Sequence, residues 1–144
     1  MADLGQGDPT GDGASGGPGN RTPAIFERTV KDEIFGPVRQ KLTVTETSVS
    51  KETWFAHHYT ESRIAILRDG VLDFTHFHQG EGRWDPLWAY VDVGDVATAK
   101  AMLNAIASAS DPFSKFDEIY GCLHDYVSNQ NGWGRRVRLM KPCI

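Results

Sequence analysis

The sequence predicts an α+β fold, with an antiparallel meander sheet of five to six strands packed against one N-terminal helix and two C-terminal helices. Residues 42–93 contain runs of alternating side chains that are typical of strands, and the segments on either side show the three- and four-residue apolar spacing of helices. Because short turns separate the expected strands, neighbours along the chain should pair antiparallel.

The domain boundary is predicted near residue 21. Residues 1–21 are expected to form a disordered tail, because Gly, Pro and Asp dominate this segment and offer little apolar surface. Residues 22–144 are expected to form a single α+β domain. The chain of 144 residues is 40% hydrophobic and 24% charged, so one domain is able to bury its own core.

The predicted N-terminal helix begins at Thr22 and Pro23, which are typical of a helix cap and a first turn, and ends at Gly36 and Pro37. Its expected apolar face recurs every three or four residues and consists of Ile25, Phe26, Val30, Ile34 and Phe35. We therefore expect one amphipathic helix that covers part of the sheet.

Five strands are predicted next, at residues 42–49, 53–59, 63–67, 71–78 and 87–93. Asp69 and Gly70 separate the third strand from the fourth, and Asp-Gly between two apolar runs indicates a tight β-hairpin. Glycines and a proline in residues 79–86 predict a loop before the fifth strand.

The two C-terminal helices are predicted to begin after the caps Asp95 and Asp111, and Pro112 follows the second cap. Their expected buried faces are Val96, Ala99, Met102, Leu103, Ile106 and Ala107, and then Phe113, Phe116, Ile119, Tyr120, Leu123 and Val127. A last strand is expected from Arg135 to Lys141.

Charge and cysteine content limit the partners and the cellular compartment that we expect for the protein. The net charge of −4 provides no long-range attraction to nucleic acid or to an anionic membrane, and no run of eighteen apolar residues predicts a membrane span. Cys122 and Cys143 follow no spacing pattern, so both are expected to be free thiols in a reducing, cytoplasmic compartment.

A metal site is one functional hypothesis. His76 and His78 are separated by one residue on a predicted strand, so both imidazoles should project from the same face. Two imidazoles on one face suit a divalent metal, with Glu81 as the third ligand, whereas a solvent-facing pair would need no cofactor. The other side chains that remain open as a third ligand are His57, His58, Asp85 and His124.

The same stretch resembles the first motif of the cupin family, because Gly70, His76, His78 and Glu81 stand in a similar order. The resemblance implies metal ligation by the two histidines and the glutamate inside a double-stranded β-barrel. The chain departs from the motif because Glu81 follows His78 too soon and no second histidine motif is found. The two consecutive helices after residue 94 also disfavour such a barrel.

A nucleic-acid interface is a second hypothesis. Arg136 and Arg138 should share one face of the last strand, and Trp133 precedes them, so this hypothesis expects a base to stack on Trp133 beside the guanidinium groups. The competing interpretation is an edge strand that charge protects against aggregation, and the negative total charge favours it.

Aromatic density between residues 54 and 93 favours protein binding as the leading function, because Trp and Tyr anchor interfaces. Phe74 and Trp88 are expected in the core. The predicted protein-binding residues are Trp54, His58, Arg83, Trp84 and Asp85.

The sequence thus predicts a non-enzymatic binding module, such as an inhibitor, an immunity-type protein or a viral or phage accessory factor. Its partner is expected to be another protein, with a homo-oligomer as an alternative, and no catalytic residue is assigned. The other classes are a small metal-dependent enzyme with His76 and His78 as ligands, and a nucleic-acid binder.

Overall fold

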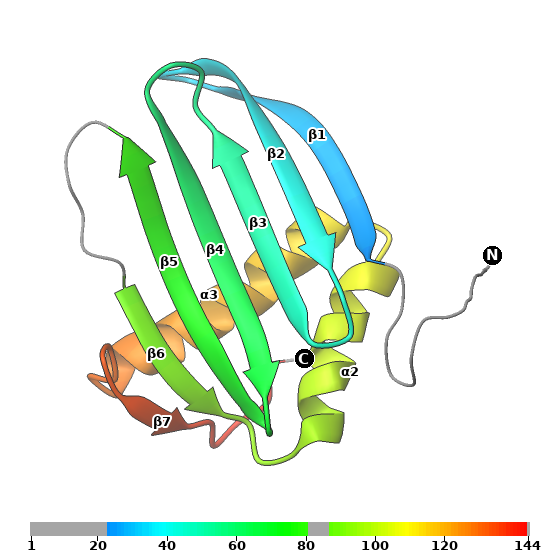
Figure 1. Cartoon of the computed structure of the whole chain (residues 1–144), viewed down its shortest axis with the longest axis vertical. Helices are drawn as coiled ribbons and strands as arrows, with labels where there is room; N and C mark the ends of the chain where they lie inside the picture. Colours follow the sequence, from blue (N-terminus) through cyan, green and yellow to red (C-terminus); the bar gives the residue numbers. More distant parts are fainter. Residues whose placement is uncertain (1–22, 81–86, 144) are drawn as a thin grey trace.

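The computed structural model describes residues 23–80 and 87–143, and within them the chain forms a seven-stranded sheet with two helices on one face (Figure 1). The predicted tail (residues 1–21) and most of the predicted loop (residues 81–86) lie outside the described residues. The elements are β1 (Ala24–Asp32), β2 (Gly36–Val44), β3 (Ser48–Trp54), β4 (Tyr59–Arg68), β5 (Val71–Gly80), β6 (Leu87–Asp92), α2 (Val96–Ser108), α3 (Pro112–Asn129) and β7 (Arg136–Arg138).

The predicted α+β class and meander are confirmed. The strands lie in the sheet in the order β1 to β7, and each of the first six pairs antiparallel with its neighbour along the chain. The predicted count of five to six strands is too low, because the described residues alone form seven. β7 pairs parallel to β6, since α2 and α3 carry the chain back to the same end of the sheet.

The predicted N-terminal helix is wrong, because that segment forms the hairpin of β1 and β2. Side chains in β1 alternate between half-buried and exposed, and Ile34, expected on a buried helix face, is 83% exposed at the turn. The Asp32 carboxylate accepts hydrogen bonds from the backbone N–H groups of Ile34 and Phe35, and Gly36 supplies a positive φ of 75°. This local turn chemistry ends β1 and starts β2.

Two predicted strands are divided by turns. The segment 42–49 contains the turn between β2 and β3, where the Thr45 hydroxyl lies 2.8 Å from that of Ser48. The segment 53–59 contains the turn between β3 and β4, where Ala56 adopts a positive φ of 55°. The predicted Asp-Gly hairpin is confirmed, with φ values of 53° at Asp69 and 80° at Gly70.

Both C-terminal helices are confirmed together with their caps. The Asp95 carboxylate accepts from the Thr98 N–H, and the Asp111 carboxylate accepts from the Ser114 N–H. The six predicted apolar residues of α3 are all buried, and four of the six predicted for α2 are buried. Among the residues that the structure describes, neither helix combines the length and apolar character needed to span a membrane.

Cys122 and Cys143 form a disulfide, so the prediction of two free thiols is wrong. The bond joins α3 to the segment that follows β7, with 5.8 Å between the two Cα atoms. The sequence argument for a reducing compartment therefore no longer holds, because disulfides persist mainly in oxidising environments.

Replacing Cys143 with serine should lower the free energy of unfolding by about 3 kcal/mol, because the disulfide closes a loop with a sequence separation of 21 residues. Urea unfolding of wild type and C143S, with and without reductant, measures the loss. Reduced wild type should match C143S, and identical midpoints for oxidised and reduced wild type would contradict the expected contribution.

Candidate functional site

Two rows of polar side chains cross the helix-facing surface of the sheet near the turn between β3 and β4. The members of each row are register partners on neighbouring strands, so they lie side by side. The first row consists of Lys51, Arg63 and His76, and the second consists of Thr53, Glu61 and His78.

These rows lie between the sheet and α3. Further along β5, Leu72 and Phe74 point to the same side and are fully buried in the core. The Lys51 ammonium donates a 2.8 Å hydrogen bond to the Asp117 carboxylate on α3, and its side chain is only 8% exposed. The apolar core therefore ends at a polar layer that contacts the same helix.

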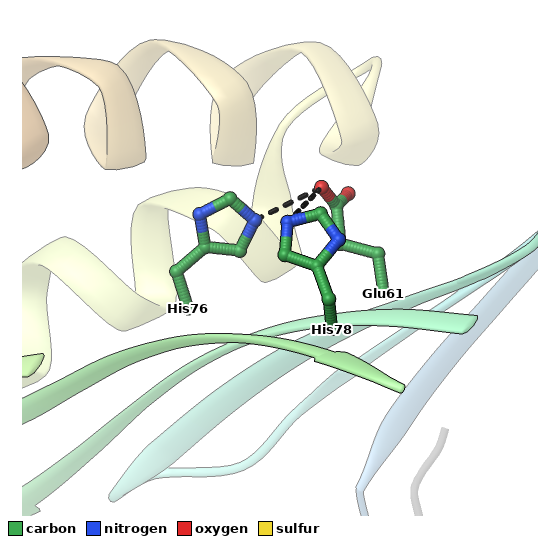
Figure 2. A group of neighbouring side chains, drawn as sticks. All are labelled: Glu61, His76 and His78. Carbon is green, nitrogen blue, oxygen red and sulfur yellow. Dashed lines mark hydrogen bonds and ion pairs between the residues drawn. The ribbon is translucent and has the colours of Figure 1, made fainter. Parts of the chain in front are cut away.

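Glu61, His76 and His78 form a compact cluster within this layer (Figure 2). Nε2 of His76 lies 2.9 Å from Oε2 of Glu61, and Nε2 of His78 lies 3.7 Å from the same oxygen. The side chains are 13% exposed for Glu61, 15% for His76 and 21% for His78. One carboxylate oxygen thus faces two imidazoles in a partly buried position.

Arg63 holds the other side of the Glu61 carboxylate. Its Nε donates to Oε1 at 3.2 Å and its Nη2 donates to Oε2 at 3.3 Å. Burial raises the pKa of Glu61, but the hydrogen bond from His76 and the Arg63 charge outweigh burial and bring this pKa to about 2. Glu61 is therefore ionised at neutral pH, and His76 donates the proton of their hydrogen bond.

The surroundings of His78 disfavour its charged form. Burial lowers the pKa of His78, and the neighbouring His76 lowers this pKa further against the opposing effect of Glu61. The two imidazole rings lie 4.7 Å apart between centroids.

Tyr120 on α3 forms the apolar side of the cluster. Its ring stacks on Phe74 at 4.6 Å between centroids, and the Arg63 guanidinium carbon lies 5.2 Å from the ring. The hydroxyl is buried and has no hydrogen-bond partner within the described part of the chain. Burial also raises the pKa of Tyr120 well above its usual value, so the hydroxyl remains neutral.

A cleft of about 300 Å³ lies beside the cluster, between α3 and the first four strands. Glu61 and Arg63 belong both to the cleft wall and to the hydrogen-bonded group with His76. The ionisable side chains that line the cleft are Lys31, Asp32, Lys51, Glu61, Arg63 and Asp117.

Two of the three predicted metal ligands lie in the described part of the chain. His76 and His78 share one face, as the strand parity indicated, but Glu81 lies outside the described residues. The structure places Glu61, which the sequence argument missed, beside both histidines. Counting residue pairs outward from the Asp69-Gly70 turn places Glu61 opposite His78. The sequence therefore contained the information needed to predict this neighbour.

The other side chains considered as a third ligand lie elsewhere or outside the described residues. His57 is exposed in the turn between β3 and β4, and the ring of His58 lies 4.8 Å from that of Phe35. The ring of His124 lies 5.1 Å from Trp133. Asp85 lies outside the described residues.

Two of the five predicted protein-binding residues, Trp54 and His58, lie in the described part of the chain. Trp54 lies under the Arg39 guanidinium at 5.0 Å, and His58 is exposed in the turn that follows β3. Arg83, Trp84 and Asp85 lie outside the described residues.

The outer face of the sheet, opposite the helices, carries large exposed side chains instead. Phe77 is 37% exposed, Trp88 is 39% exposed and Tyr90 is 43% exposed. The expectation that Trp88 fills the core is therefore wrong, whereas Phe74 is fully buried as expected. Parity explains the difference, because Trp88 pairs with the outward-facing Thr75.

The predicted nucleic-acid residues are divided between the core and the surface. Trp133 is half-buried, its Nε1 donates to the Ser128 hydroxyl, and its ring lies 6.0 Å from that of Phe74. Arg136 and Arg138 are exposed on either side of the buried Val137, as the strand pattern predicted.

Comparison with models of protein families, with curated proteins and with solved structures finds no match for this chain. The cupin resemblance gains no support from the fold either, because the described strands form one open meander sheet with two helices on one face. The chemistry of the site is therefore derived from its own residues.

The Tyr120 hydroxyl provides a test of this packing. A buried hydroxyl without a partner costs about 1–3 kcal/mol, so Y120F should raise the free energy of unfolding by about 1 kcal/mol. Urea unfolding of metal-free protein measures the change. A fall in stability of the same size would show that the hydroxyl has a stabilising partner in solution.

Proposed function

We propose that this chain binds a divalent transition-metal ion through Glu61, His76 and His78, and that the ion is the Lewis-acid centre of a small enzyme. The observation that carries the proposal is the convergence of one carboxylate oxygen and two imidazole nitrogens, all within 4.8 Å of one another. The three side chains come from adjacent strands of one rigid sheet, which favours a fixed ligand geometry.

The separations of the donor atoms suit a metal ion. Ligand atoms about 2 Å from a tetrahedral zinc ion lie about 3.3 Å from one another. The distances from Oε2 of Glu61 to Nε2 of His76 and of His78 are 2.9 Å and 3.7 Å, on either side of that value. Ligation by His76 Nε2 also requires its proton to move to Nδ1 or to leave, because that proton is shared with Glu61 in the hydrogen bond.

The ligand set points to catalysis rather than to a purely structural ion. Two imidazoles and one carboxylate hold catalytic zinc and non-haem iron(II), and they leave at least one coordination position for water or substrate. A divalent ion at such a site lowers the pKa of bound water and polarises a carbonyl or phosphoryl oxygen.

Arg63 supports Glu61 in this role. A carboxylate ligand that is itself hydrogen-bonded keeps its orientation, and Arg63 donates to both oxygens of Glu61. The Tyr120 ring beside the guanidinium limits the movement of Arg63. The carboxylate is thus fixed before the ion arrives.

The metal test uses zinc and single substitutions of the ligands. Wild type should bind one zinc ion per chain, and H76A, H78A and E61Q should each bind zinc roughly a hundredfold more weakly, because each loses a ligand. Competition with a chromophoric chelator measures the affinity, and elemental analysis after dialysis gives the stoichiometry.

A matched variant controls this test. H57A removes an exposed histidine outside the cluster. It should bind zinc as wild type does. Equal zinc affinity in H57A and H76A, or an absence of stoichiometric zinc in wild type, would contradict the proposal.

Protein binding, the leading expectation from the sequence, is the second candidate function, and the outer face of the sheet favours it. Phe77, Trp88 and Tyr90 lie on adjacent strands of this face, and the half-buried Ile64 and Ile66 continue it on β4. We propose a second copy of this chain as the partner, because apolar sheet faces pack against one another about 10 Å apart.

Sedimentation equilibrium tests this self-association. Wild type should form dimers, and the double variant W88S/Y90S should remain monomeric over the same concentrations. I34S changes an 83% exposed residue at the turn between β1 and β2 and should dimerise as wild type does. A monomeric wild type at all concentrations would remove the second candidate.

A further inference from the structure

The side chains that line the cleft do not neutralise the charge of a bound metal ion. Three cationic and three acidic side chains line the cleft, so their charges cancel. A divalent ion at the neighbouring cluster adds two positive charges, and nearby Lys51 and Glu61 have little exposure to water. Because uncompensated charge is costly away from water, the loaded site favours an anionic ligand.

The Arg63 guanidinium retains N–H donors for such a ligand. Its Nε and Nη2 atoms bind Glu61, and within the described part of the chain Nη1 makes no hydrogen bond. The side chain is 32% exposed and belongs to the cleft wall. A guanidinium presents its remaining N–H groups in a plane that matches the oxygens of a carboxylate or phosphate.

Lys51 adds a second cation in the same row. Lys51 lies directly opposite Arg63, an arrangement of like charges that destabilises a sheet unless other groups compensate. Asp117 accepts one hydrogen bond from the Lys51 ammonium, which has three donors. Binding of an anion explains two adjacent cations in this mostly buried row better than a contribution to folding stability does.

We infer that the cleft binds the oxyanion group of a small substrate, with one oxygen on the metal ion and others on Arg63 and Lys51. The inference rests on the metal site proposed above and names its substrate class. The shared chemistry is a carboxylate or a phosphate beside the reacting atom.

The size and lining of the cleft describe the rest of the substrate. A volume of about 300 Å³ is at the lower end for small-molecule sites, so the ligand is small. Val30, Val38 and Phe55 contribute apolar wall next to the cations. The substrate is therefore a small anion with a short apolar portion.

Calorimetry with methylphosphonate as the probe tests the inference. Zinc-loaded wild type should bind methylphosphonate at least tenfold more tightly than metal-free protein does. R63Q should bind zinc more weakly, because Arg63 orients Glu61, and at zinc concentrations that saturate both proteins it should bind the probe at least tenfold more weakly than wild type. Dimethyl methylphosphonate, which carries no charge, should not bind.

R39Q is the matched control, because Arg39 is exposed and contacts Trp54 on β3 outside the cleft. It should bind methylphosphonate as wild type does. If R63Q loses zinc, the double variant K51M/D117N, which removes one charge of each sign, decides in its place and should show the same tenfold loss of probe binding.

The outcomes separate the two claims. Zinc binding without methylphosphonate binding, or equal probe affinity in wild type and R63Q, would overturn the oxyanion site and leave the metal site intact. A wild type that binds no zinc would overturn both.

Discussion

The register between β4 and β5 is the constraint on which the rest of the site depends. The Asp69-Gly70 turn pairs the two strands so that Glu61 lies opposite His78. A slip of one residue would turn the side chains of one strand to the opposite face and would expose Phe74, which is fully buried. The alternation that builds the apolar core therefore also fixes the positions of the carboxylate and the imidazoles.

The two polar rows occupy positions on the helix-facing surface of the sheet where apolar side chains would extend the core. Lys51 is paired with Asp117, and Arg63 is paired with Glu61, so each mostly buried charge has a partner. Apolar residues in place of a buried ion pair are often neutral or stabilising for a fold. Such a layer is expected where stability is exchanged for function, and so is a buried Tyr120 hydroxyl that has no hydrogen-bond partner among the described residues.

Local chemistry explains which elements the sequence predicted. The helices after Asp95 and Asp111 and the Asp-Gly hairpin depend on caps and turn residues that act over three or four positions. The apolar residues of β1 and its turn also fit the spacing of a helix. The segment forms a strand because it pairs with β2.

Long-range partners explain what the sequence argument missed. Glu61 lies fifteen residues before His76 and reaches it only through the strand register, whereas Glu81, the ligand predicted from the sequence, is close to the histidines along the chain. Cys122 and Cys143 lack a spacing pattern, and only the return of the chain from β7 to α3 brings them together. The order of the strands was not predicted beyond a meander, and the parallel pairing of β7 was not anticipated.

Anomalous X-ray diffraction at the zinc absorption edge, from crystals of the full chain grown with zinc, tests the metal centre most directly. The account predicts one strong anomalous peak per chain within about 2.2 Å of Glu61 Oε2 and of a ring nitrogen in both His76 and His78. An anomalous peak confined to other residues, with Glu61 still hydrogen-bonded to His76, would contradict it.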